Sequence, residues 1–189
     1  MRNVIFQMMI SLDGFFEGPD KELDWHVVDE EFISYAADLL NTVDTILFGR
    51  VTYEMMADYW PTPGAIAGNP FIAGRMNTLP KIVFSPTLDK AEWQNTTIVE
   101  GNIGEAVTKL KQQPGKSMVI FGSSDLAVAL TKLGLIDEYR IIVNPVVLGG
   151  GKALLLGINE RLKLKLADVK TFSSGTVLLS YHPDTGEHA

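Results

Sequence analysis

The chain has 189 residues, of which 46% are hydrophobic, and it carries a formal net charge of −7 and no cysteine. This length and composition predict a single domain over residues 1–189 with a substantial core. The absence of cysteine excludes disulfides and thiolate metal sites and fits the cytoplasm. The negative charge argues against nucleic acid as a partner, and no apolar run has the length of a membrane span or the pattern of a signal peptide.

The first half of the chain alternates between strand and helix patterns. The apolar stretch Val4–Ile10 predicts a strand, and turn residues follow it at Asp13 and Gly14. Asp29 is a typical N-cap for a helix that ends near Leu40. Further strands are expected at 45–48, 81–84 and 96–99, and further helices at 52–59, 69–77 and 103–111. Residues 60–70, with three prolines and two glycines, predict a loop that serves as a lid or binding loop.

The second half continues this alternation and ends differently. A strand is expected at 119–121, a helix at 124–133 and a long strand at 137–147, broken by Pro145. The glycines 149–151 then permit a positive φ. Alternating residues at 162–166 and 176–181 predict an antiparallel hairpin. Together these elements indicate a mixed, mainly parallel α/β sheet with helices on both faces and a C-terminal antiparallel hairpin.

Two of the predicted strands end on a glycine and lead directly into a helix. Gly49 precedes Arg50 and Thr52, and Gly122 precedes Ser123 and Ser124. A helix N-terminus presents unpaired backbone N–H groups, which bind phosphate. Two such sites in one domain favour a ligand with several phosphates, such as a dinucleotide. The Gly-x-Gly-x-x-Gly fingerprint does not follow the first strand, which disfavours the fold defined by that motif.

Short motifs occur in an order that resembles a known superfamily. They are Ser11-Leu12-Asp13-Gly14, Phe48-Gly49-Arg50-x-Thr52-Tyr53-Glu54, Phe121-Gly122-Ser123-x-x-Leu126, Leu135-Ile136-Asp137-Glu138 and Pro145-Val146-Val147-Leu148-Gly149-Gly150-Gly151. This order resembles the dihydrofolate reductase-like superfamily and, within it, the C-terminal reductase domain of riboflavin biosynthesis and its stand-alone relatives. The resemblance spans almost the whole chain and implies a three-layer fold.

The resemblance also implies a function. It predicts an NADPH-dependent reductase that transfers a hydride to a small heteroaromatic or pterin-like substrate. Dihydrofolate and the pyrimidine intermediate of the riboflavin pathway are alternative substrates, and a nucleotide-binding module without chemistry is an alternative function on the same fold. The acidic run 29–31 stands where riboflavin reductases carry basic residues for a ribosyl phosphate, which argues against the riboflavin intermediate.

By the same resemblance, one set of residues is expected to hold the cofactor. It comprises Gly49, Arg50, Thr52, Ser85, Gly122, Ser123, Ser124, Leu126, Gly149 and Gly150. Ser85 stands where related reductases place a serine–arginine pair for the 2′-phosphate, but Pro86 occupies the arginine position. Arg50 or Lys90 could replace that arginine, and NADH stays an alternative cofactor.

The substrate is expected near Trp25, Glu31, Tyr53 and Trp60. The two tryptophans either stack on an aromatic ring or cover the edge of the core. Asp13 is our candidate proton donor, and its alternative role is that of a turn residue in Asp-Gly. Tyr53 either donates a proton or packs. The scattered histidines indicate no metal site.

The apolar stretch 145–148 suggests a contact surface between two copies of the chain. Relatives of the riboflavin-reductase type often form dimers, so the resemblance implies a homodimer. The glycines 149–151 that follow either let the backbone approach the nicotinamide or form a turn.

Overall fold

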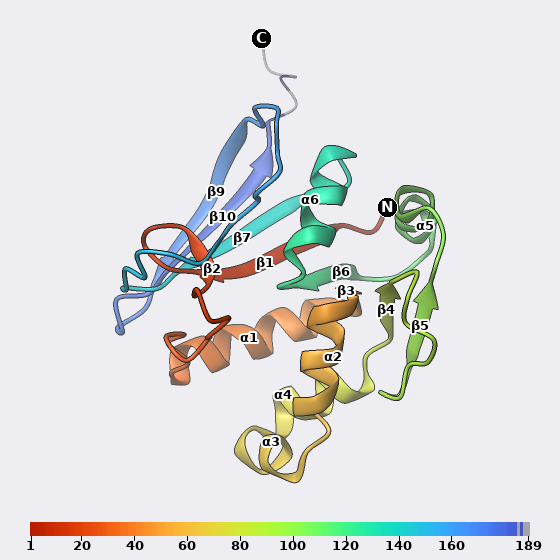
Figure 1. Cartoon of the computed structure of the whole chain (residues 1–189), viewed down its shortest axis with the longest axis horizontal. Helices are drawn as coiled ribbons and strands as arrows, with labels where there is room; N and C mark the ends of the chain where they lie inside the picture. Colours follow the sequence, from red (N-terminus) through yellow and green to blue (C-terminus); the bar gives the residue numbers. More distant parts are fainter. Residues whose placement is uncertain (185, 187–189) are drawn as a thin grey trace.

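The computed structural model describes residues 1–184 and 186, and an eight-stranded sheet organises them (Figure 1). The strands lie in the order β5-β4-β3-β6-β1-β7-β10-β9. They are β1 (Val4–Ile10), β3 (Val43–Gly49), β4 (Lys81–Phe84), β5 (Thr96–Val99), β6 (Ser117–Phe121), β7 (Glu138–Val143), β9 (Leu164–Thr171) and β10 (Val177–Pro183). Neighbours from β5 to β7 are parallel, and β10 is antiparallel to both β7 and β9.

Helices cover both faces of this sheet, each over its own apolar core. One face is covered by α1 (Glu30–Thr42), α2 (Arg50–Tyr59) and α4 (Pro70–Thr78), and the other by α5 (Ile103–Gln112) and α6 (Ser124–Lys132). Strand β3 shows how the sequence divides between the cores, because Ile46 and Phe48 belong to the first and Leu47 to the second. This period of two is that of a strand buried on both faces. The predicted three-layer, mainly parallel fold is confirmed.

Two predicted helix starts are present with their caps. The Asp29 carboxylate accepts a hydrogen bond from the Phe32 N–H at 2.8 Å, and the Asn69 side chain accepts one from the Ile72 N–H at 3.0 Å. These side chains satisfy N–H groups that have no partner within the first turn of the helix. The C-terminal hairpin of β9 and β10 is confirmed as well.

Two predicted elements need correction, and one element was missed. Residues 60–70 are not a plain loop, because α3 (Pro63–Gly68) lies within them and Pro63 occupies its first turn, where a missing N–H costs nothing. The strand predicted at 137–147 ends at Val143. A separate two-stranded sheet of β2 (Phe15–Glu17) and β8 (Lys152–Ala153) was not predicted.

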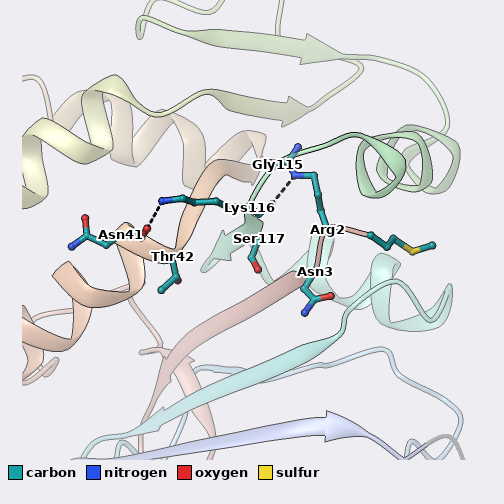
Figure 2. Close-up of a pocket in the computed structure, with 8 residues that line it drawn as sticks. Arg2, Asn3, Asn41, Thr42, Gly115, Lys116 and Ser117 are labelled. Atoms are coloured by element: carbon teal, nitrogen blue, oxygen red, sulfur yellow. Dashed lines mark hydrogen bonds between the residues drawn. The ribbon is translucent and has the colours of Figure 1, made fainter.

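A hollow of about 430 Å³ lies at the amino ends of β1 and β6 (Figure 2). There the Arg2 Nε donates to the Lys116 carbonyl oxygen at 2.7 Å, and the same guanidinium pairs with Asp44. The Lys116 ammonium donates to the Asn41 carbonyl oxygen at 2.9 Å. These contacts anchor the start of the sheet at the edge opposite to the one where the parallel strands end. In the part of the chain that the structure describes, none of the helices is both long enough and apolar enough to span a membrane.

Candidate functional site

The carboxyl edge of the parallel sheet brings the starts of α2 and α6 together. Strands β3 and β6 are neighbours, and each leads directly into its helix. Helix α2 leaves toward one face of the sheet and α6 toward the other. In open α/β sheets, a crevice forms at the carboxyl ends of strands whose connections leave in this way, and ligands bind there.

These two helices differ from their neighbours in how they begin. Side chains of Asp29, Thr62, Asn69 and Asn102 cap α1, α3, α4 and α5. By contrast, Gly49 and Ser123, the N-cap residues of α2 and α6, give their own helices no side-chain cap within the described residues. The N-terminus of a helix carries a partial positive charge from the helix dipole, and N–H groups of the first turn that lack a cap can bind an anionic ligand there.

A pair of reciprocal hydrogen bonds holds the two helix starts together. The Gly49 N–H donates to the Ser123 hydroxyl oxygen at 3.0 Å, and the Ser123 N–H donates to the Thr52 hydroxyl oxygen at 3.0 Å. We call this pair of bonds the helix-start clasp. It connects residues from the two predicted phosphate motifs, which lie far apart in the sequence. The clasp therefore fixes the distance between the two sets of N–H groups.

The backbone at Gly122 and Ser123 is left-handed, with φ of +60° and +48°. Alanine at position 122 would place its Cβ 3.3 Å from the Thr52 Cγ2 and would need an unfavourable φ. Gly49 differs, because its φ is −82° and a Cβ there would meet its neighbours at 3.9 Å or more. Gly122 is thus required by the protein itself, whereas a Cβ at Gly49 would make only ordinary contacts with Ser123 and Leu126.

The other residues predicted for the phosphates lie nearby but differ in exposure. Arg50 begins α2, is 43% exposed at its side chain, and pairs with Glu54 at 3.0 Å. Ser124 and Leu126 are buried at the start of α6. The Ser85 hydroxyl is buried and accepts hydrogen bonds from the N–H groups of Thr87 and Leu88. Ser85 therefore shapes the turn after β4, and Arg50 is a partly exposed cation at this edge.

The glycine run after β7 lies against the loop after β1. Gly149 and Gly151 have φ of +74° and +130°, and a Cβ on Gly151 would overlap the Glu17 carbonyl oxygen. At Gly150 a Cβ would lie 3.8 Å from Pro19. The close approach of backbone at Gly151 is thus to β2 of the same chain. Gly149 and Gly150, the residues predicted to meet the cofactor, keep space around them.

Asp13 is an acceptor in this structure. Its two carboxylate oxygens accept hydrogen bonds from the N–H groups of Leu148, at 3.1 Å, and Gly149, at 2.7 Å. The Ser11 hydroxyl and these N–H groups lower the pKa of Asp13 to about 2. Both carboxylate oxygens are thus acceptors for N–H groups of the loop after β7, and the proton-donor role that we expected for Asp13 stays a prediction.

Among the described residues, the four residues predicted for the substrate make no hydrogen bond or ring contact with one another. Tyr53 is a core residue, a correction to our expectation: it is buried beside Phe48 and Trp93, and its hydroxyl oxygen accepts from the Trp93 N–H at 3.1 Å. Trp60 ends α2 and is half-buried, with its indole N–H on the Met56 sulfur.

The other two residues predicted for the substrate, Trp25 and Glu31, contact loop residues. The Trp25 indole N–H donates to the Glu22 carbonyl oxygen, and its ring lies edge-on to His26. The Glu31 carboxylate accepts from both the N–H and the hydroxyl of Ser173, which lowers its pKa and ties the start of α1 to the C-terminal hairpin.

Sequence reasoning missed one cation beside α6. The Lys152 ammonium lies 3.4 Å from the Asp125 carboxylate in the first turn of α6 and over the Phe16 ring. Its position directly after the glycine run was the available signal. Among the described residues, no group of three or more histidine and acidic side chains could hold a metal ion.

Several known proteins are similar to this chain. The Bacillus subtilis (strain 168) protein YyaP is 36% identical over 181 residues, which cover 96% of this chain and 95% of that protein. A protein from Shewanella sp. PV-4 named for riboflavin biosynthesis has a TM-score of 0.73 at 23% identity, with 97% and 99% of the two chains covered. Dihydrofolate reductase from Enterococcus faecalis, in complex with NADP(H), has a TM-score of 0.65 at 16% identity, with 96% of each chain covered.

These last two likenesses show the fold. The family follows from a sequence profile, that of the RibD C-terminal domain, which matches residues 2–178. This match includes β1, both helix starts and the glycine run. The chain belongs to the RibD C-terminal domain family.

Proposed function

We propose that the protein is an NADPH-dependent reductase of a small heteroaromatic or pterin-like substrate and that it acts in the cytoplasm, a compartment that fits the absence of cysteine. The observation that carries this proposal is the pair of uncapped helix starts held side by side by the helix-start clasp. One phosphate-binding N-terminus is common, but two at a fixed separation suit a dinucleotide. Membership of a family that includes pyrimidine reductases supports the same reading.

The residues present fit such a cofactor. The start of α2, with Gly49, Arg50 and Thr52, would hold the adenosine-side phosphates. The start of α6, from Gly122 to Ser124, would hold the pyrophosphate, with Lys152 as a nearby cation. When bound, the nicotinamide supplies the hydride, and the protein supplies position and electrostatics.

Charge compensation at this edge also favours a phosphorylated ligand. Arg50 pairs with Glu54, one turn further along α2, and Lys152 pairs with Asp125 in the first turn of α6. Such exposed pairs contribute little to stability, typically below about 1 kcal/mol. Both cations can therefore exchange their carboxylate partners for phosphate oxygens at small cost, and Arg50 is our candidate for the 2′-phosphate of NADPH.

The test is a titration of the whole protein with NADPH, with NADH in parallel, followed by tryptophan fluorescence. We expect saturable quenching at lower concentrations of NADPH than of NADH. A subsequent screen measures oxidation of NADPH at 340 nm with pterin and pyrimidine substrates. Equal and weak responses to both dinucleotides would contradict the proposal.

A nucleotide-binding module without chemistry is the second candidate. One observation favours it: Asp13, the residue that we expected to donate a proton, is instead held by the N–H groups of Leu148 and Gly149. Tight NADPH binding with no turnover of any substrate in the screen would support this candidate over the reductase.

A further inference from the structure

Two loops leave the carboxyl edge of the sheet side by side. One follows β1 and the other follows β7, and these two strands are parallel neighbours. Backbone hydrogen bonds join the loops at two points: the Leu12 N–H donates to the Val146 carbonyl oxygen at 2.7 Å, and the Leu154 N–H donates to the Gly14 carbonyl oxygen at 2.9 Å. Strands β2 and β8 continue the pairing beyond them. The loops therefore form one double-loop unit.

The Asp13 carboxylate bridges this unit at its centre. One oxygen accepts from the Leu148 N–H and the other from the Gly149 N–H, so two successive amides point to one side chain. Hydrogen bonds to an ionised acceptor are stronger than those between neutral groups. Because glycine at φ of +74° has little conformational preference of its own, the acceptor decides where the Gly149 peptide points.

We propose that Asp13 is a positioning residue that holds the glycine run 149–151 in the shape that receives the nicotinamide end of the cofactor. The proposal rests on the proposed function for the ligand and on the double-loop unit for the mechanism. It replaces the role of proton donor, because a carboxylate that accepts two N–H bonds acts through the loop that it holds. Asp13 would thereby raise the fraction of protein molecules in which the glycine run 149–151 has the conformation that binds the cofactor.

The experiment compares Asp13→Ala and Asp13→Asn with Asp24→Asn. Asp24 is an exposed carboxylate in the same region, and its side chain makes no hydrogen bond within residues 1–184 and 186. Asparagine keeps one acceptor oxygen, whereas alanine keeps none. Amide hydrogen exchange, measured by NMR at Leu148 and Gly149, directly reports the two hydrogen bonds that these N–H groups donate to the Asp13 carboxylate. Affinity for NADPH reports its consequence.

We expect faster exchange at these two amides in Asp13→Ala, with core amides of β6 unchanged as evidence of folding. The affinity for NADPH should fall about fivefold or more, as it does when a binding-competent loop is populated only part of the time. Asp13→Asn should lie between wild type and Asp13→Ala in both measurements, and Asp24→Asn should match wild type.

Unchanged exchange at Leu148 and Gly149 in Asp13→Ala would overturn the proposal, and so would unchanged NADPH affinity. Loss of turnover in Asp13→Asn with wild-type exchange and affinity would overturn it too, by returning Asp13 to direct proton transfer. If the wild-type protein does not bind NADPH, the proposed function fails, and with it the role toward the nicotinamide, while exchange still decides whether the carboxylate holds the loop.

Discussion

Gly122 and Gly49 end adjacent strands, yet the protein needs glycine at only one of them. Gly122→Ala places a side chain at φ of +60° and 3.3 Å from Thr52, so we expect a loss of about 1–2 kcal/mol in the free energy of unfolding. Gly49→Ala meets no such strain and should change it by less than about 0.5 kcal/mol. Urea denaturation of both variants measures this, and equal stabilities would contradict the assignment.

Arg50 offers a second test at the scale of one residue. Arg50→Ala should weaken NADPH about tenfold, since it removes a charge-assisted contact to phosphate. The loss of the Arg50 side chain should hardly change the free energy of unfolding, because its exposed ion pair with Glu54 contributes only about 0.3–0.5 kcal/mol. The matched variant Glu54→Gln breaks the same ion pair but keeps the guanidinium. It should bind NADPH at least as well as wild type, and parallel losses in the two variants would contradict a phosphate contact.

His26 makes the stability depend on pH. Burial lowers the pKa of His26 to about 4, and its Nε2 is buried without a hydrogen-bond partner among the described residues. The unfolded chain, with a pKa near 6.5, therefore binds more protons than the folded one between about pH 4 and 6.5. Stability must fall as the pH is lowered through this window, by at most about 3 kcal/mol. The difference in unfolding free energy between wild type and His26→Gln at pH 7 and pH 4.5 measures it, and a constant difference would refute it.

At the scale of elements, the helix-start clasp couples α2 to α6. Thr52→Val keeps the shape of the side chain but leaves the Ser123 N–H without its acceptor, which should cost about 1 kcal/mol or somewhat more. Thr97→Val, on the exposed side of β5, is the control. The double variant Thr52→Val with Ser123→Ala should lose less than the sum of the single losses, because both residues belong to one pair of bonds. Additive losses would show that the two helix starts are independent.

The elements that sequence predicted well are those with local signals. Asp29 and Asn69 cap their helices through residues three positions away, and the chemistry of such caps is visible in any window. Strands β2 and β8 escaped prediction because two or three residues show no periodicity. Helix α3 was predicted as a loop because proline occurs both in loops and in the first turn of helices, and the sequence around Pro63 does not distinguish the two.

The site divides in the same way. The glycine-to-helix motifs at Gly49 and Gly122 were found because the motif is contiguous. By contrast, Asp13 binds Leu148 and Gly149, which lie far away in the sequence. The partner of Tyr53, Trp93, is also distant in the sequence. No local pattern indicates whether an aspartate in Asp-Gly donates a proton or holds a distant loop. The packing of β1 beside β7, which brings Asp13 to Leu148 and Gly149, depends on the whole fold and not on a local pattern.

At the scale of the whole molecule, the loops after β1 and β7 expose large apolar side chains. Leu12 and Val147 are 68% and 65% exposed, and the hydrogen bond from Leu12 to Val146 places them near one another. We propose that this surface contributes to a homodimer. Val147→Glu should then shift the sedimentation coefficient from dimer to monomer, whereas Leu133→Glu, 56% exposed at the end of α6, should not. A monomeric wild type at micromolar concentration would contradict the proposal.

The position of β6 has a consequence for how the molecule folds. β6 lies between β3 and β1, although it is made after β3, β4 and β5, so the early strands cannot close into one sheet until this later segment enters. The helix-start clasp between Gly49, Thr52 and Ser123 is therefore completed only with that insertion. A nucleotide that recognises both helix starts should bind only the folded protein, in which β6 is already inserted into the sheet. It should therefore slow unfolding and leave the rate of refolding unchanged. Nucleotide binding can then serve as a kinetic reporter that synthesis and sheet closure are complete.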